Sequence, residues 1–223
     1  MNTFRAILTG STGMVGRAVL LECLDHPQVE RVLVVNRRPL DVQPPKLREE
    51  ILEDFRRVDR LRSVFADYDA CFYCAGVSAV GKSEAEYRRI TYDLTRTFAE
   101  TCYAANPRMV FNYVTGQGAD SSESGRVVWA RVKGATENKL FDLGFGDAYA
   151  FRPGIILPER GIRSSTGWYN AFYVLARPLF PWLRRLSSVV TTTQFGRAMI
   201  HSVLRGTDRK KLENPDIARL AEG

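Results

Sequence analysis

The feature of the sequence that most constrains its fold is a glycine-rich stretch at residues 9–16, which reads TGSTGMVG. A short apolar run at residues 4–9 leads into it, and a helical pattern extends from residue 13 to about residue 24. At such a junction the first glycine permits a tight turn, the second lets the backbone approach a pyrophosphate, and the third lets the helix lie close to the sheet. An anion there faces the positive end of the helix. The motif therefore predicts a dinucleotide contact through Gly10, Ser11, Thr12, Gly13, Met14, Val15 and Gly16.

Apolar runs alternate with helical patterns along the rest of the chain. We expect strands at residues 32–36, 50–54, 70–75, 109–115 and 149–153. We expect helices at residues 58–65, 83–104 and 124–143. Such alternation predicts a parallel sheet with helices on both faces, a doubly wound, Rossmann-like α/β fold. The 223 residues suit one domain, in which residues 155–205 contribute a small substrate-side lid.

Two local signals refine this pattern. Ser83 followed three residues later by Glu86 forms a capping box, which makes residue 83 a credible start for the long central helix. Gly144 follows the helix expected at residues 124–143 and closes it.

The end of the second strand bears on the choice of cofactor. Folds that bind NAD place an acidic residue there, on the ribose 2′-hydroxyl. This sequence has Asn36, Arg37 and Arg38 instead. Arginine can grip a 2′-phosphate with a forked pair of hydrogen bonds, whereas a carboxylate would repel it. We therefore favour NADP over NAD, the alternative being that Arg37 and Arg38 are solvent-facing loop charges.

The formal net charge of +7 comes mostly from arginines scattered in pairs, which favours solvated faces over a nucleic-acid partner. Cys71 and Cys74 lie in an apolar run expected to be a buried strand, where residues three apart point to opposite faces. With only two histidines in the chain, we expect buried free thiols and no metal site. A small molecule is the expected partner.

The apolar region at residues 168–186 is interrupted by Arg177, Pro178 and Pro181, so it should not span a bilayer. Its aromatic and basic residues suit a membrane surface, but a lid or a homodimer contact explains the same composition and is preferred. The start of the sequence shows no secretory signal, from which we expect a cytoplasmic protein.

Taken in order, several motifs resemble the short-chain dehydrogenase/reductase superfamily. The similarity is closest to its atypical and extended branches, such as the Tat-interacting-protein-like and NAD-dependent epimerase-like proteins. It covers residues 3–160 well and residues 160–205 more weakly. Besides the glycine turn, the resemblance implies cofactor contacts from Asp54 and Phe55, from Cys74, Ala75 and Gly76, and from Arg152, Pro153 and Gly154.

In this superfamily a Tyr moves the proton that balances hydride transfer, a Lys four residues later holds the nicotinamide ribose, and a Ser or Thr holds the substrate oxygen. The resemblance assigns the Lys to Lys133 and the hydroxyl to Thr115, with Gln117 as a second candidate. The Tyr position is Trp129, whose indole N–H gives up no proton at working pH. No Tyr in the chain has Lys four residues after it, so any proton donor must come from elsewhere.

Tyr169 and Tyr173 are candidates for such a donor, although apolar filling of the lid explains them better. Two functions remain open. The first is an NADPH-dependent reductase of a planar or carbonyl-type acceptor, which stacks on Trp129 and takes its proton from water. The second is a non-catalytic regulatory or assembly protein that senses NADP(H), because Lys133 and the glycine turn are kept while the Tyr is lost.

Overall fold

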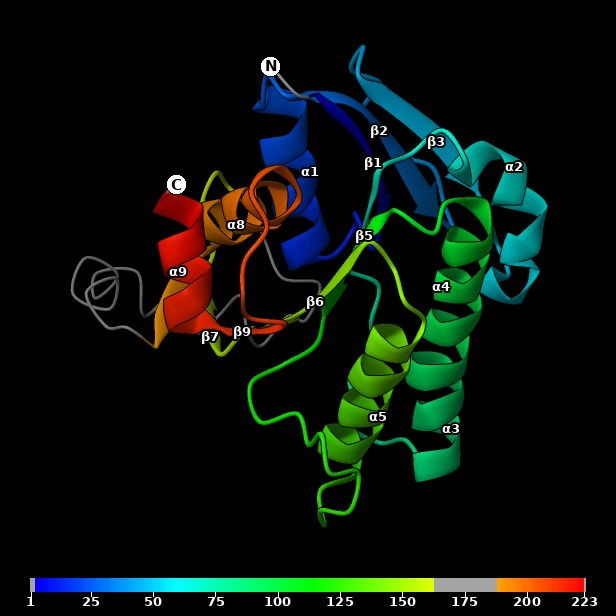
Figure 1. Ribbon diagram of the computed structural model, residues 1–223, viewed down its shortest axis with the longest axis vertical. Coiled ribbons are helices and arrows are strands. Elements are labelled where there is room, and N and C mark those ends of the chain that lie inside the picture. Colours follow the sequence, from blue (N-terminus) through cyan, green and yellow to red (C-terminus); the bar gives the residue numbers. More distant parts are fainter. Residues whose placement is uncertain (1–2, 163–187, 223) are drawn as a thin grey trace.

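The computed structural model describes residues 3–162 and 188–222, and these residues build a seven-stranded sheet with helices on both faces (Figure 1). All neighbouring strands are parallel, in the order β3-β2-β1-β4-β5-β6-β9. The predicted doubly wound α/β fold is confirmed. The strands are β1 (Phe4–Thr9), β2 (Val29–Asn36), β3 (Leu47–Ile51), β4 (Ala70–Tyr73), β5 (Val110–Val114), β6 (Asp147–Arg152) and β9 (Lys211–Glu213).

The helices form two layers, each packed on its own hydrophobic cluster. One face of the sheet is covered by α1 (Met14–Asp25), α8 (Thr192–Leu204) and α9 (Asn214–Glu222). The other face is covered by η1 (Phe55–Leu61), α2 (Arg62–Phe65), α4 (Leu94–Ala105) and α5 (Val128–Asp142). Because both faces are covered, the inner strands are apolar on both sides, and β1 is buried along nearly its whole length.

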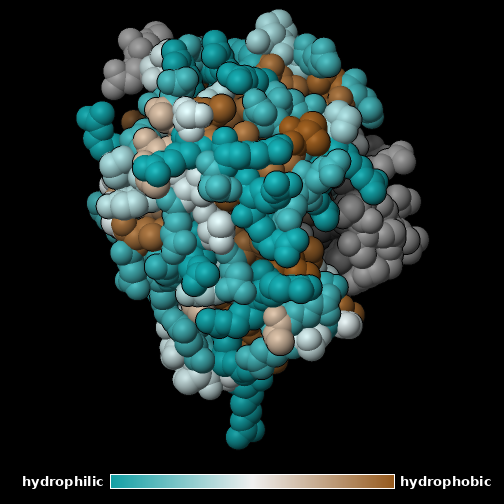
Figure 2. Space-filling model, turned by 90° about the vertical axis from the view of Figure 1, so that its right-hand side faces the viewer, coloured by the Kyte–Doolittle hydropathy of each residue, from teal (hydrophilic) through white to brown (hydrophobic). Residues whose placement is uncertain are grey.

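The long helix predicted at residues 83–104 is present, as α3 (Glu84–Arg88), a π-helical turn η2 (Arg89–Asp93) and α4 in succession. Ser83 caps it as expected, because its hydroxyl accepts a hydrogen bond from the Glu86 backbone N–H at 3.2 Å. Figure 2 shows that the side of the molecule around α2 and α4 is mostly hydrophilic, with apolar residues in scattered small patches.

Several predicted boundaries are wrong: β2 begins at Val29 rather than at residue 32, for example, and two other differences have a local cause. The third strand lies at Leu47–Ile51 rather than residues 50–54, since Leu52 turns to bond the Asn36 carbonyl at the end of β2. The helix predicted from residue 124 begins at Val128, because the Asp120 carboxylate accepts backbone hydrogen bonds from Ser122 and Gly125 and folds the intervening residues into a turn.

The region expected to form the lid is only partly described. Residues 155–157 form β7 (Ile155–Leu157), which pairs with β8 (Val189–Thr191) in a separate two-stranded sheet. Helix α8 packs closely on α1 in the main layer, where a Cβ on Gly196 would lie 2.7 Å from Cγ of Glu22. The apolar region at 168–186, with Tyr169 and Tyr173, lies outside the described residues.

Candidate functional site

The glycine turn lies at the carboxyl end of β1, between β1 and α1 (Figure 1). Gly10 has φ +70°, and a Cβ there would lie 2.6 Å from the Cys74 carbonyl oxygen. A Cβ on Gly16 would lie 2.2 Å from the carbonyl oxygen of Gly10, so the protein itself requires both glycines. At Gly13 the nearest atom is 3.4 Å away, which leaves this glycine free to admit a ligand.

The N-terminus of α1 is suited to an anion. Its N-cap, Gly13, provides no side-chain cap, and its first turn contains no acidic residue. The first backbone N–H groups therefore have no side-chain acceptor, and the helix dipole adds positive potential at the same place. The strand order also changes direction at β1, where β2 and β4 lie on opposite sides, and ligands of open α/β sheets bind at such switch points.

A buried polar network joins the turn to β2 and β3. The Ser11 hydroxyl donates to Oδ1 of Asn36 at 3.0 Å, and Nδ2 of Asn36 donates to Oε1 of Glu49 at 3.3 Å. The expectation that no acid stands near the end of the second strand is therefore incomplete, because β3 supplies one. Sequence reasoning missed Glu49, since parallel pairing of β2 with β3 brings it there and the third strand was placed three residues too late.

Arg37 and Arg38 follow Asn36 at the carboxyl end of β2, and both are exposed. Neither guanidinium forms a hydrogen bond or ion pair with another residue in the described parts of the chain. Both cations are therefore available to a phosphate at this edge of the sheet.

Asp54 and Phe55, two of the expected cofactor contacts, follow β3, which pairs with β2. The Asp54 carboxylate caps η1 and binds Arg56, whose guanidinium lowers the pKa of that carboxyl. The Phe55 ring stacks on Phe98 with a centroid distance of 5.9 Å. After β4, the Ala75 N–H donates to the Thr9 hydroxyl at 3.1 Å, which holds this segment beside β1.

Gly76 continues that segment past Cys74 and Ala75. A Cβ placed on Gly76 would meet no atom within 4 Å, so the space beside it is open. Cys23, Cys71 and Cys102 are buried free thiols, and Cys74 is a partly exposed free thiol. The predicted burial is therefore confirmed for Cys71 and is wrong for Cys74.

Helix α5 presents Trp129 and Lys133 to the loop that follows β5. Nζ of Lys133 donates to the Thr115 carbonyl oxygen at 2.6 Å, and burial lowers the pKa of Lys133 to about 8. The Trp129 ring covers the loop, since a Cβ on Gly116 would lie 3.7 Å from its Cζ3 and one on Gly118 would lie 3.6 Å from its Cη2. The cation and the flat apolar ring thus lie at the end of β5, where the resemblance places the nicotinamide.

Thr115 and Gln117 differ in their surroundings. Thr115 is buried, and its Oγ1 has no hydrogen-bond partner among the described residues. The Gln117 side chain turns instead toward Gly154, where a Cβ would lie 2.4 Å from its Oε1. The Gln117 N–H donates to the Pro153 carbonyl oxygen at 3.0 Å and ties this loop to the segment after β6, where the Gly154 N–H donates to Oδ1 of Asn214 at 3.0 Å.

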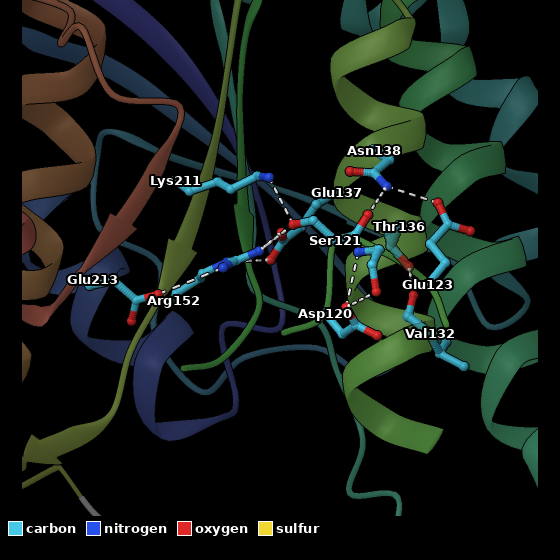
Figure 3. Close-up of polar contacts among 11 residues, drawn as sticks. Asp120, Ser121, Glu123, Val132, Thr136, Glu137, Asn138, Arg152, Lys211 and Glu213 are labelled. Atoms are coloured by element: carbon cyan, nitrogen blue, oxygen red, sulfur yellow. Dashed lines mark hydrogen bonds and ion pairs between the residues drawn. The ribbon is translucent and has the colours of Figure 1, made fainter. Parts of the chain in front are cut away.

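Arg152, expected to contact the cofactor, points into an internal polar cluster (Figure 3). Its Nε donates to Oε1 of Glu137 at 3.0 Å, and its Nη2 donates to the second carboxylate oxygen. Nη2 also donates to the Ser121 hydroxyl at 2.9 Å, which accepts from Lys211 at 2.7 Å as well. Glu137 is fully buried, so this cluster anchors the 120–127 loop to β6 and β9, and the cofactor contact of Arg152 stays a prediction.

The remaining residues follow one path along the carboxyl ends of the strands. Arg37 and Arg38 stand at one end, the glycine turn lies in the middle, and Lys133 with Thr115 lies at the other end. This order fits an extended dinucleotide, with the helix N-terminus at its pyrophosphate and the buried lysine at its second ribose.

A sequence model of the NAD dependent epimerase/dehydratase family matches residues 6–124, more than half of the chain. Protein HTATIP2 of Rattus norvegicus is 27% identical over 232 residues, which cover 100% of this chain and 91% of that protein. Protein fmp52-1, mitochondrial, of Aspergillus terreus is 28% identical over 159 residues, which cover 69% of this chain and 67% of that protein. These findings confirm the resemblance to epimerase-like and extended short-chain dehydrogenases.

Solved structures show the same fold. MoeE5 in complex with UDP-glucuronic acid and NAD matches with a TM-score of 0.67 and 17% identity, covering 93% of this chain and 74% of that one. A short chain dehydrogenase from Burkholderia cenocepacia in complex with NADP also matches with a TM-score of 0.67, at 14% identity, covering 98% of this chain and 92% of that one. One structure holds NAD and the other NADP, so the neighbours do not decide between the two cofactors.

The expected cytoplasmic location is wrong, because the fungal relatives bear names that place them in mitochondria. That expectation relied on the lack of a secretory signal, which does not distinguish one intracellular compartment from another. Across residues 3–162 and 188–222, no helix has the length and apolar character needed to cross a membrane.

Proposed function

The chain belongs to the NAD dependent epimerase/dehydratase family, and from this premise we propose that it is an NADPH-dependent reductase of a small planar or carbonyl-type acceptor. The observation that carries the proposal is the pair formed by Lys133 and the Thr115 carbonyl at 2.6 Å. This bond fixes a buried ammonium at the end of β5 and leaves two of its three N–H donors for ribose hydroxyls. Such a fixed donor contributes by positioning, because its geometry is set before the ligand arrives.

The preference for NADP rests on Arg37 and Arg38. Both lie exposed at the end of β2 without partners among the described residues, and a 2′-phosphate is the anion that distinguishes NADP at this place. The glycine turn and the uncapped start of α1 would hold the pyrophosphate of either cofactor.

Trp129 decides the class of acceptor. When bound, the reduced nicotinamide supplies the hydride, and the protein supplies orientation and a surface for the second reactant. The indole offers a flat apolar ring over Gly116 and Gly118, which suits a planar acceptor such as a quinone, a flavin or a conjugated carbonyl. Reduction of such an acceptor can draw its proton from water, so it does not require a phenol at position 129.

A second function, an NADP(H)-sensing regulatory or assembly protein, is favoured by a different observation. The Thr115 hydroxyl, expected to hold a substrate oxygen, is buried rather than presented at an open surface. A site of this kind can bind the cofactor and still lack a contact for the reacting oxygen of a substrate.

Binding is tested by titrating the protein with NADPH and NADH while tryptophan is excited and energy transfer to the reduced nicotinamide is recorded. We expect NADPH to bind more tightly than NADH. If neither nucleotide binds, both functions are refuted.

Activity is tested by following NADPH oxidation with quinones, flavins and aldehydes. For the reductase we expect turnover that falls in Lys133→Ala and persists in Lys139→Ala, a control on the same helix whose ammonium pairs with Glu100. No turnover with any acceptor, together with carbonyl reduction gained in Trp129→Tyr, would favour the sensor instead.

A further inference from the structure

The loop that carries Arg37 and Arg38 is closed by a single carboxylate, that of Glu49. The Leu40 N–H donates to both of its oxygens, at 3.0 Å and 3.2 Å, and Nδ2 of Asn36 donates to Oε1 at 3.3 Å. Residues 37–39 therefore form a short bridge whose two ends are bonded to one side chain of the neighbouring strand β3.

Other features of the loop limit its conformations further. Pro39 fixes its own φ and restricts the backbone of Arg38 before it. Leu40 packs against the hydrophobic cluster on the α1 face of the sheet. Because Pro39 has no N–H, the Leu40 N–H is the donor that fastens this end of the bridge, and Glu49 is its acceptor.

The same network reaches the glycine turn. Asn36 is buried, and its Oδ1 accepts from Ser11 while its Nδ2 donates to Glu49. Its amide is thus engaged on both sides within the protein, which leaves recognition of a ribose substituent to the exposed residues that follow it. The glycine turn and the 37–39 loop are therefore connected through the hydrogen-bonded side chains of Ser11, Asn36 and Glu49.

On the basis of the proposed NADP(H) binding, we infer that Glu49 is a positioning residue for cofactor choice, which fastens the 37–39 loop so that its two arginines meet the 2′-phosphate. A carboxylate at this place is unexpected, because its negative charge should repel the 2′-phosphate. Its oxygens, however, accept hydrogen bonds from the Leu40 N–H and the Asn36 amide. Glu49 therefore contributes through the length of its side chain and through these hydrogen bonds.

Two substitutions separate the effect of the length of the Glu49 side chain from the effect of its charge. Glu49→Gln keeps the length of the side chain and one acceptor oxygen but removes the charge, whereas Glu49→Asp keeps the charge and shortens the side chain by one methylene. The matched controls are Glu50→Gln and Glu50→Asp, because Glu50 lies next to it on β3 and pairs with Arg48.

The measurement is the ratio of the NADH and NADPH dissociation constants, obtained from the tryptophan energy-transfer titration. We expect Glu49→Asp to reduce the preference for NADPH about tenfold, as for the loss of one charge-assisted hydrogen bond. We expect Glu49→Gln to stay within about threefold of the wild type, because its amide oxygen still accepts from Leu40. Both controls should leave the ratio unchanged.

An unchanged ratio in Glu49→Asp would overturn the inference, and so would a loss in Glu49→Gln that equals or exceeds that in Glu49→Asp. The proposed function fails in a different way. If the wild type binds NADPH and NADH equally, or if Arg37→Ala and Arg38→Ala leave the ratio unchanged, then there is no preference for Glu49 to support. In that case the NADP assignment itself is refuted.

Discussion

Replacement of Lys133 by methionine is expected to change how the free energy of unfolding depends on pH. Burial of its ammonium on α5 lowers the pKa from 10.5 to about 8, although Glu137 raises it. In the unfolded chain the amine keeps its ordinary pKa. Between these two values the unfolded state binds more protons than the native state, so the wild-type protein gains stability as the pH rises through this window.

The size of the effect follows from the shift. At 1.36 kcal/mol per pKa unit, the protonated buried amine costs about 3 kcal/mol below pH 8. About 1 kcal/mol of this cost is relieved between pH 7 and pH 9. In Lys133→Met the cost is absent at every pH, while the lost hydrogen bond to the Thr115 carbonyl destabilises by about 1 kcal/mol. We therefore expect the variant to be more stable than the wild type by about 2 kcal/mol at pH 7 and by about 1 kcal/mol at pH 9.

The assay is urea unfolding followed by far-ultraviolet circular dichroism at both pH values. Titration of the groups that do not interact with Lys133 is common to both proteins and cancels in the difference. Lys139→Met is the control, because Lys139 lies on the same helix, is about one-third exposed and pairs with Glu100. Its difference from the wild type measures what a lysine-to-methionine exchange on this helix contributes by itself. Parallel profiles for the wild type and Lys133→Met would refute the reasoning, since they would mean that the ammonium keeps an ordinary pKa and is solvated.

Three further predictions concern two closely packed glycines and one buried ion pair. Gly16→Ala places a Cβ 2.2 Å from the carbonyl oxygen of the first glycine in the motif, so we expect dinucleotide binding to be lost in the fluorescence titration. Gly134→Ala places a Cβ 1.8 Å from a loop carbonyl oxygen and should destabilise by about 3 kcal/mol in urea unfolding, whereas Gly76→Ala, which meets no atom, should not. Glu137→Ala removes the buried carboxylate that binds Arg152, whose side-chain exposure is 12%, and leaves Arg152 the longer ion pair with Glu213 at 3.7 Å. It should also cost about 3 kcal/mol by the same assay; a loss below about 1 kcal/mol would mean that the ion pair is solvated.

Local signals in the sequence were sufficient for most of the fold. The glycine turn, most of the apolar runs and the Ser83 cap each depend on residues close together in the chain, and each is found at or near its predicted position. The third strand was misplaced because Leu47–Ile51 is an edge strand with charged residues, which an apolar run does not reveal. Strand β9 and helix α9 were not predicted, since β9 has three residues and depends on its pairing with β6.

The candidate site was predictable from the sequence only where all the residues of a motif lie on one helix or strand. Trp129 and Lys133 lie four residues apart on α5, and helical spacing places both on the same face. Arg152 was linked to the cofactor by its motif, but the structure brings it to Glu137, a partner from another element. Glu49 was missed for the same reason. Such pairs depend on how strands and helices dock, which local patterns do not encode.

Glu137 could have been found from the spacing that revealed Lys133, because it follows one helical turn later on the same face of α5. Its buried carboxylate raises the pKa of Lys133 against the effect of burial and is itself held by Arg152. With Trp129 where the resemblance expects a Tyr, Lys133 has no phenol to activate, and in the proposed function it donates hydrogen bonds to a ribose. The ammonium offers three N–H donors for that use, more than the neutral amine, and the Glu137 carboxylate favours the ammonium. The ion pair that anchors the 120–127 loop therefore also supports the charge of Lys133 on which the proposed cofactor binding relies.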